Sequence, residues 1–311
     1  MSTDVISPPT PQSAELSTPG NQDQLTRSRR AKRRRAKEWT PRLIIAHVAI
    51  VFAALIFSVP LIYAFFSALK PQYEVFGNPP TLIGSEVRWS NFVDVFTYGP
   101  FVTYFVNSFF VAAAGTLVTI FVSTTAGYAF ARLRWKGRDA VFVLFLVTLM
   151  VPQEVLVVPM FQMMQAFGWV NSYPSLIFPW AFTAFGTFLM RQFYRGIPFE
   201  LEEAARIDGA GPVRTFIKII FPLGTSAVAV LAVFSFLGFW NSYLWPLITI
   251  QDYSTLGTLP IGLTTFSSLN GTRWDLQMAA AIISMVPTTV LVIALQKHLV
   301  KGIAMSGLGG R

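Results

Sequence analysis

The side chains in this sequence that could do chemistry gather in one short segment, residues 202–211, which reads Glu-Glu-Ala-Ala-Arg-Ile-Asp-Gly-Ala-Gly. The 311-residue chain has no cysteine, so a thiolate nucleophile, a disulfide and a cysteine-based zinc site are excluded. Its two histidines, His47 and His298, are too few and too far apart for a metal cluster. No Gly-x-x-x-x-Gly-Lys-Ser/Thr phosphate loop is present either. The segment therefore indicates a contact surface rather than a catalytic site.

We expect a short helix and a sharp turn in this segment. Pro198 suits the first helical turn, where its missing N–H costs nothing, and the acids that follow favour the positive end of the helix dipole. Leu201, Ala204 and Ala205 are spaced i, i+3, i+4, which predicts one small apolar face that another surface can approach closely. Gly209 supplies the positive φ that ends the helix. An ordinary amphipathic surface helix fits the same spacing, so both interpretations stay open at this point.

The elements that position this segment are apolar stretches. The chain is 53% hydrophobic and 13% charged, whereas soluble domains carry about 25% charged residues. A membrane-spanning helix needs about 20 mostly apolar residues. We therefore predict an all-α integral membrane protein with six transmembrane helices across residues 41–311. The six candidate spans are 43–69, 102–131, 139–161, 174–194, 217–249 and 277–299.

Basic residues predict the orientation of these spans. Eight of them crowd into residues 27–37, just before the first span. In a soluble protein such a run would indicate nucleic acid, but before a spanning helix it predicts a cytoplasmic anchor that binds anionic membrane lipid. Residues 1–40 are then a disordered, basic cytoplasmic tail, and no nucleic acid is expected as a partner.

An inside N-terminus gives a strongly asymmetric charge distribution. Six spans threaded from it leave only Lys70, Arg88 and Arg273 outside, so 21 of the 24 lysines and arginines lie inside. This asymmetry predicts that both termini are cytoplasmic. It also predicts that the short helix at residues 202–211 lies in the cytoplasm, between spans four and five.

The spacing around residues 202–211 continues along the chain. The Glu-Ala-Ala triplet at 203–205 is followed by Gly209, then by Ile219 ten residues on and Pro222 three residues further. This pattern resembles the cytoplasmic coupling loop of ATP-binding-cassette importer permeases. Over about residues 41–311 the chain resembles carbohydrate permeases of the maltose-transporter kind, the smaller of the two partner subunits. It departs from that family at Phe221, where leucine is more usual, and after Gly302. The other matching stretches are Asn107-Ser108, residues 126–132 (Ala-Gly-Tyr-Ala-Phe-Ala-Arg), Val151-Pro152 with Pro159, residues 240–247 (Trp-Asn-Ser-Tyr-Leu-Trp-Pro-Leu) and residues 296–302.

This resemblance implies a multi-pass permease subunit of an ATP-driven importer in a bacterial cell membrane. The implied partners are a second permease subunit, a cytoplasmic ATPase dimer, an extracellular solute-binding protein and a carbohydrate solute. ATP would be bound by the ATPase, so this chain is expected to be no enzyme and to hold no cofactor or metal. Mono-, di- and oligosaccharides, polyols and sugar phosphates all remain open as solutes. The implied coupling to the ATPase runs through residues 198–212, and the implied ATPase-coupling residues are Glu203, Ala204, Ala205, Asp208, Gly209, Ala210, Ile219 and Pro222.

Polar side chains within the spans are candidates for a translocation path, because polar groups are costly in a membrane and tend to face a cavity or another helix. We select Asn241, Tyr243, Ser123 and Glu154, since aromatic, amide and hydroxyl groups suit sugar rings. Helix packing, an interfacial aromatic belt and a structural partner for Glu154 are the alternative roles. A self-contained secondary transporter of a small polar solute is the alternative function, although we find no clear internal repeat or ion-coupling set.

Overall fold

The computed structural model describes residues 41–268 and 271–308. The predicted disordered tail, residues 1–40, lies outside them. The chain divides into two compact units, Met1–Val59 and Pro60–Arg311. Of the first unit the structure describes only residues 41–59, which form the first part of helix α2 (Pro41–Ala68). The second unit holds the rest of α2 and every other helix and strand of the described residues, and it is described on its own below.

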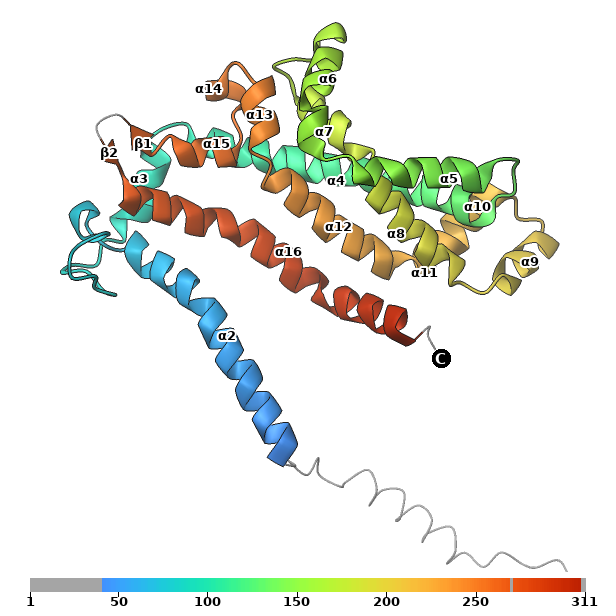
Figure 1. The fold of residues 1–311 in the computed structure, drawn as a ribbon, viewed down its shortest axis with the longest axis horizontal. Coiled ribbons are helices and arrows are strands. Elements are labelled where there is room, and N and C mark those ends of the chain that lie inside the picture. The colour runs from blue at the N-terminus through green and yellow to red at the C-terminus, as the bar shows by residue number, and fades with distance from the viewer. Residues whose placement is uncertain (1–40, 269–270, 309–311) are drawn as a thin grey trace, which may run out of the picture. The chain divides into compact units, whose positions relative to one another are not determined.

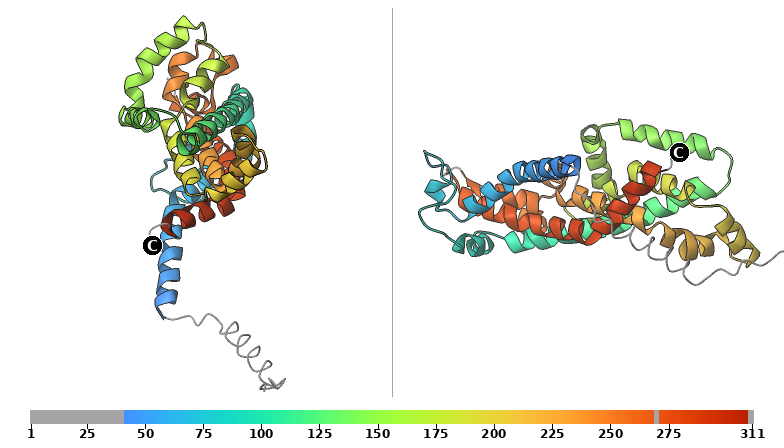
Figure 2. Two further views of the ribbon diagram at one scale, coloured as in Figure 1. Left: turned by 90° about the vertical axis from the view of Figure 1, so that its right-hand side faces the viewer. Right: turned by 90° about the horizontal axis from the view of Figure 1, so that it is seen from below.

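Helix α4 (Phe101–Arg132) runs lengthwise through the second unit (Figures 1 and 2). It packs against α7 (Tyr173–Ala181), α8 (Ala184–Arg195) and α12 (Thr225–Trp240). Helix α12 packs in turn against α16 (Trp274–Leu308). Helix α4 is therefore in direct contact with these three helices of this unit and is linked to α16 through α12.

Small residues allow α4 and α8 to approach closely. A Cβ atom added at Gly127 of α4 would lie 2.6 Å from the Cβ of Met190 and 3.0 Å from the backbone nitrogen of Arg191. The hydrophobic effect does not drive helices together in lipid, because lipid tails are as apolar as the helices. Close van der Waals packing at small residues is therefore a main source of helix–helix attraction in membranes. The glycine in the Ala-Gly-Tyr run is thus explained by this contact.

Three helices are long and apolar enough to cross a membrane, and two bent helix pairs raise the number to five if each pair is one span. The structure is therefore mostly helical with three to five candidate spans among the described residues. The three unbroken candidates are Leu43–Ala68, Phe101–Arg132 and Trp274–Lys297. The two bent pairs are Arg138–Met150 with Gln153–Ala166, at 104°, and Pro212–Leu223 with Thr225–Trp240, at 76°.

The bends occur where proline or glycine interrupts the predicted spans. Val151 precedes a proline and is extended, because proline disfavours helical backbone at the residue before it. The second bent pair breaks at Gly224, which separates the two helices. The predicted span 174–194 falls into the two short helices α7 and α8, which part at Phe182 and Thr183.

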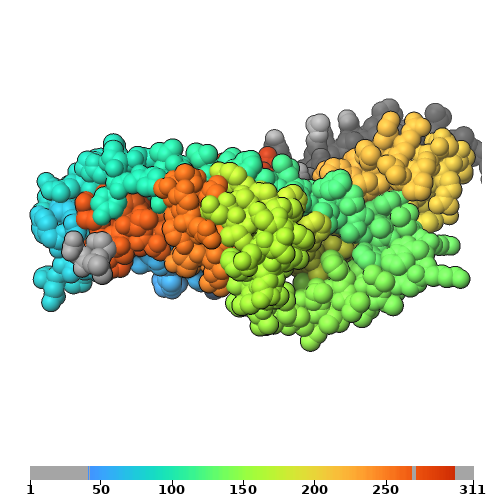
Figure 3. Space-filling model, turned by 90° about the horizontal axis from the view of Figure 1, so that it is seen from above, coloured from blue at the N-terminus to red at the C-terminus, as the bar shows by residue number. Residues whose placement is uncertain are grey.

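Short elements connect the long helices. In the space-filling view, residues of α6 and α7 lie beside residues of α13 and α14 (Figure 3), and Met164 and Leu176 pack there with Trp245. The connecting helices are η1 (Gln72–Glu74), α3 (Ser90–Thr97), α5 (Arg138–Val147), η2 (Thr148–Met150), α6 (Gln153–Ala166), α9 (Glu200–Ile207), α10 (Pro212–Thr215), the π-helix η3 (Phe216–Ile220), α11 (Phe221–Leu223), α13 (Leu244–Thr249), α14 (Tyr253–Leu256) and α15 (Leu259–Thr264). A small antiparallel hairpin pairs β1 (Ser267–Ser268) with β2 (Gly271–Thr272).

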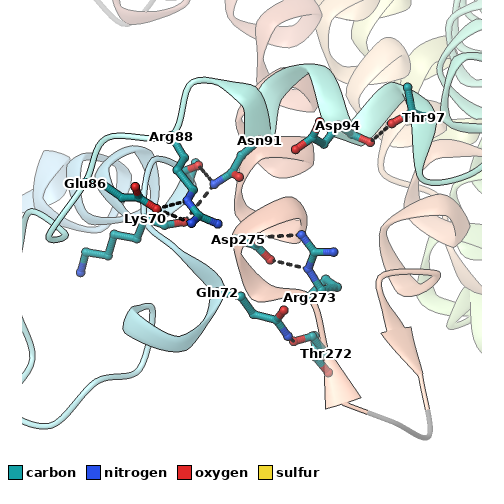
Figure 4. Close-up of polar contacts among 11 residues, drawn as sticks. Lys70, Gln72, Glu86, Arg88, Asn91, Asp94, Thr97, Thr272, Arg273 and Asp275 are labelled. Carbon is teal, nitrogen blue, oxygen red and sulfur yellow. Dashed lines mark hydrogen bonds and ion pairs between the residues drawn. The ribbon is translucent and has the colours of Figure 1, made fainter.

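The end of the second unit that carries α3 and the hairpin is held by buried polar contacts (Figure 4). The side-chain amide of Asn91 donates to the carbonyl oxygens of Ala68 and Lys70, at 2.8 and 2.9 Å. Lys70 is only 1% exposed, and its ammonium group donates to the carbonyl of Thr81. These contacts fix the segment that leaves α2 to the start of α3.

The three basic residues predicted to lie outside are all found at this end (Figure 4). Besides Lys70, they are Arg88, which pairs with Glu86, and Arg273, which pairs with Asp275 at 2.9 Å. Helix α9 lies at the opposite end of the same unit (Figure 1). The candidate contact segment is thus far from this group of residues.

Candidate functional site

Helix α9 forms where the short helix was predicted, and a glycine turn ends it. The amide of Gly209 donates to the carbonyl of Arg206 at 3.0 Å, and the amide of Ala210 donates to the carbonyl of Ala205 at 2.9 Å. This pair of bonds is the Schellman motif, which places the residue after the cap in the left-handed region. Gly209 has a φ of +77°, and a Cβ atom added there would meet nothing within 4 Å. The predicted positive φ is confirmed, and backbone conformation rather than space requires the glycine.

The inward face of α9 differs from the one that the spacing predicted. Glu202 and Ala205 are buried, each 6% exposed, whereas Leu201 is 42% exposed, Ile207 is 86% exposed and Ala204 is also exposed. Of the predicted apolar face, Leu201 and Ala204 are exposed and can be approached by another surface, whereas the prediction is wrong for Ala205, which is buried. Consecutive residues lie about 100° apart around a helix, and the buried side of α9 is the one that carries Ala205 together with Glu202, which pairs with a charged residue of another helix.

That charged residue is Arg132, the last residue of α4. Its Nε lies 3.0 Å from a carboxylate oxygen of Glu202, and the two side chains are only 6% and 7% exposed. A terminal guanidinium nitrogen of Arg132 donates to the carbonyl of Tyr194, in the last turn of α8, and to that of Ile197, in the connection after it. The guanidinium group also lies 5.6 Å from the ring centroid of Phe199. One side chain thus contacts the end of α8, the connection after it and the first turn of α9.

The buried position of Glu202 has an electrostatic cost. Burial raises the pKa of this carboxyl group above its ordinary value, although Arg132 and Arg206 act in the opposite direction. The ionised carboxylate therefore depends on its cationic neighbours to remain in place. Sequence reasoning treated Glu202 only as an acid in the first turn of a helix. The sequence feature that could have indicated its ion-pair partner is Arg132, the last residue of the run Ala-Gly-Tyr-Ala-Phe-Ala-Arg.

The opposite side of α9 and the start of the next helices form an exposed surface, which we call the α9 outer surface. Exposed acids, Glu203 and Asp208, lie among its apolar side chains. Next to α9, a shallow groove is lined by residues of the 211–218 segment. Three basic residues, Arg206, Arg214 and Lys218, are exposed on it as well. Exposed apolar side chains that gather in one place mark a protein-contact surface. The apolar members are Leu201, Ile207, Val213 and Ile217, which are 42%, 86%, 71% and 58% exposed.

Behind the turn, the chain returns to the helical core. The hydroxyl of Tyr128 on α4 donates to the carbonyl of Pro212 at 3.2 Å. Ile219 packs against a buried cluster that contains Tyr128 and Ile220. Pro222 is exposed in α11, just after the π-helix η3. Ile219 and Pro222 therefore belong to the returning helix, whereas the predicted residues from 203 to 210 belong to the α9 loop.

A second feature is a cavity of about 360 Å³ that is lined by residues of α4, α6, α7, α8, α12 and α13. Two of the four predicted path residues, Glu154 and Tyr243, line it. Among the described residues no lysine or arginine lines this cavity, and Glu154 is its one acidic side chain. Sequence reasoning missed Gln153, Trp180 and Thr183, whose roles depend on how the broken spans fold back. The lining residues are Thr119, Gln153, Glu154, Val157, Trp180, Thr183, Phe185, Phe234, Ser235, Gly238, Phe239, Ser242, Tyr243, Leu244 and Trp245.

The other two predicted path residues lie elsewhere. The amide of Asn241 donates to the carbonyl of Leu237 on its own helix at 3.0 Å, and Asn241 is not part of the cavity lining. Ser123 is fully buried, and its hydroxyl lies close to Gly186 of α8. In this structure Ser123 packs two helices together, the alternative role that its residue type allows.

Comparisons with known proteins agree on one kind of molecule. The family described as "Binding-protein-dependent transport system inner membrane component" matches residues 120–305. An arabinooligosaccharides transport system permease protein of Halalkalibacterium halodurans is 34% identical over 266 residues, which cover 85% of this chain and 95% of the relative. An sn-glycerol-3-phosphate transport system permease protein of Pectobacterium atrosepticum is 36% identical over 271 residues, with 85% and 96% covered.

A solved structure has the same fold. The crystal structure of a bacterial ABC transporter involved in the import of alginate matches with a TM-score of 0.73 and 20% sequence identity. The match covers 85% of this chain and 98% of that chain. At this identity the likeness concerns the fold alone.

Proposed function

The chain belongs to the family of binding-protein-dependent transport system inner membrane components, and from this premise we propose that it is one of two permease subunits of an ATP-driven carbohydrate importer. Its partners would be a second permease, a cytoplasmic ATPase dimer that binds the ATP, and an extracellular solute-binding protein. This chain would hydrolyse nothing itself. The self-contained secondary transporter is disfavoured, because the family works with a separate binding protein.

The observation that carries the proposal is the conformation of the α9 loop and the exposure of its outer side. A short helix is fixed on its inner side by Arg132 and is closed by a glycine turn, while its other side stays exposed. In the proposed importer the α9 outer surface contacts the ATPase, through Glu203, Ala204 and Asp208 above all. Gly209 and Ala210 close the turn, and Ile219 and Pro222 carry its movement into α12. Ala205 supports α9 from within, because it is buried.

We further propose six membrane crossings with both termini in the cytoplasm. The bent pairs would each form one crossing, and α7 with α8 would form another. The distribution of charge supports this orientation, since Lys70, Arg88 and Arg273 lie together at the end opposite α9 (Figures 1 and 4).

This topology predicts which positions a membrane-impermeant thiol reagent reaches. Because the chain has no cysteine, single cysteines report cleanly. Ser85→Cys should react in intact cells, and Ala204→Cys should react only after the membrane is opened. Position 204 is a better cytoplasmic probe than position 205, since Ala204 is exposed and Ala205 is buried. Reaction of Ala204→Cys in intact cells would contradict the orientation.

We propose an uncharged carbohydrate as the solute. The cavity offers Trp180 and Tyr243 as aromatic faces, with hydroxyl and amide groups around them. Its one acidic side chain, Glu154, would repel an anionic solute. Among the described residues, the cavity lining contains no basic side chain that would offset this repulsion. The relative named for sn-glycerol 3-phosphate handles an anion, so the two chains would differ in this respect.

The uptake of a panel of labelled solutes by a deletion strain tests this function. The panel contains arabinooligosaccharides, sn-glycerol 3-phosphate and alginate oligosaccharides. We expect the deletion to abolish uptake of a neutral oligosaccharide and to leave uptake of the two anions unchanged. Loss of an anion alone would refute the neutral class, and no loss across neutral and anionic sugars would count against a carbohydrate importer.

The cavity makes a prediction about two neighbouring residues. Tyr243→Ala should lower uptake by about fivefold, the equivalent of about 1 kcal/mol, because it removes an aromatic wall of the cavity. Asn241→Ala should have a smaller effect, since this amide bonds within its own helix. Initial rates of uptake, corrected for the amount of permease in the membrane, measure both. A larger loss for Asn241→Ala than for Tyr243→Ala would show that the cavity is not the path.

A further inference from the structure

The contacts of Arg132 join three separate parts of the chain. The guanidinium group lies at the end of α4 and forms an ion pair with the carboxylate of Glu202 on α9. It also donates hydrogen bonds to the backbone carbonyls of Tyr194, in the last turn of α8, and of Ile197, just after it. Both side chains of the ion pair are more than nine-tenths buried. Among the described residues, the other charged group that acts on Glu202 is Arg206 of the same helix, and Tyr128 of α4 is its nearby titratable neighbour.

We propose that Arg132 is a positioning residue that fastens α9 to the inner end of α4, so that a movement of α9 passes directly to α4 as well as along the chain to α12. This inference rests on the proposed function, in which the ATPase moves α9. Helix α4 packs against α7, α8 and α12. The Arg132–Glu202 contact therefore gives the ATPase a route into the helical core that bypasses the bend at Gly224.

The two partners do not depend on each other equally. Without Glu202, Arg132 keeps its two carbonyl acceptors and its contact with Phe199. Without Arg132, a buried carboxylate loses its main counter-charge, which is far more costly than losing both members of a buried pair. Arg132→Met should therefore release α9 most. Glu202→Gln should release it less, because it removes the ion pair but leaves no buried charge, and the double variant Arg132→Met with Glu202→Leu should partly restore it.

Thiol labelling measures whether α9 is seated. In the 311-residue chain, which has no other cysteine, and in everted membrane vesicles from cells without the ATPase, Ala205→Cys should react at least about tenfold more slowly than Ala204→Cys, which corresponds to about 1.4 kcal/mol of protection. Arg132→Met should bring the rate at 205 close to the rate at 204. Arg132→Lys should give an intermediate rate, because one ammonium group cannot replace the fork of a guanidinium. Arg134→Met is the matched control, since Arg134 is an exposed arginine two residues away.

Solute-stimulated ATP hydrolysis by the reconstituted complex provides the second measurement. Arg132→Met should lose most of the stimulation and keep basal hydrolysis, and Arg134→Met should keep both. Continued protection of position 205 in Arg132→Met, or full protection in Arg132→Lys, would overturn the proposal. Full stimulation in an Arg132→Met complex whose position 205 is exposed would also overturn it. A wild-type complex without stimulation would count against the proposed function instead, and labelling alone would then decide whether Arg132 holds α9.

Discussion

Replacing Gly209 with valine is expected to lower solute uptake by more than an order of magnitude. Gly209 has a φ of +77° and completes the turn that closes α9. A side chain in the left-handed region costs roughly 1–2 kcal/mol, and β-branching adds to this cost. About 2 kcal/mol would reduce the population of the closed turn by roughly thirtyfold. Initial rates of uptake, corrected for permease abundance, give the result.

The matched control is Gly209→Asn. Asparagine tolerates the left-handed region better than other residues with side chains, and space is open around this position. Uptake should therefore fall far less than with valine. Equal losses for asparagine and valine would show that the side chain itself disturbs a contact. Normal uptake with valine would show that the turn is not required for transport.

The second large effect is expected at Gly127. A Cβ atom there would lie 2.6 Å from the Cβ of Met190 and 3.0 Å from the backbone of Arg191, so valine would force α4 and α8 apart. Overpacking of this kind costs about 3 kcal/mol where backbone must move. Gly127→Val should therefore reduce the amount of folded permease, measured as the monodisperse fraction after detergent extraction.

Gly238→Val is the control for folding, because a Cβ atom at Gly238 of α12 would meet nothing within 4 Å. Both variants place a β-branched residue in a helix, so the helix propensity change is the same. The folded fraction of Gly238→Val should stay near that of the unchanged protein. Equal loss in both variants would mean that the cost lies in the helices themselves and not in the contact between α4 and α8.

Local features of the chain predicted the class of protein and the position of α9. Composition indicated membrane-spanning helices, and the run from Glu202 to Gly211 indicated a short helix that ends in a glycine turn. Both depend on residues that are near each other in the sequence. The positive φ of Gly209 was predictable for the same reason.

The features that were missed depend on partners far along the chain. Glu202 turns inward because Arg132, seventy residues earlier, lies beside it, and helical spacing cannot include that charge. Asn241 stood out as a polar residue in an apolar stretch, yet a carbonyl of its own helix satisfies it. The sequence showed a proline motif at Val151-Pro152, where the structure has a bend. The bend has an angle of 104°, which no local motif specifies, and Gln153 and Glu154 just after it line the cavity.

Stimulation of ATP hydrolysis by solute in the reconstituted complex tests the central claim most directly, because that claim is that the α9 loop couples this permease to its ATPase. The complex contains both permeases, the ATPase dimer and the loaded binding protein in liposomes. We expect Gly209→Val and Glu203→Lys to lose stimulation, the first by opening the turn and the second by reversing an exposed charge on the α9 outer surface. Gly209→Asn should retain most of it. Full stimulation and full co-purification of the ATPase in both Gly209→Val and Glu203→Lys would contradict the account.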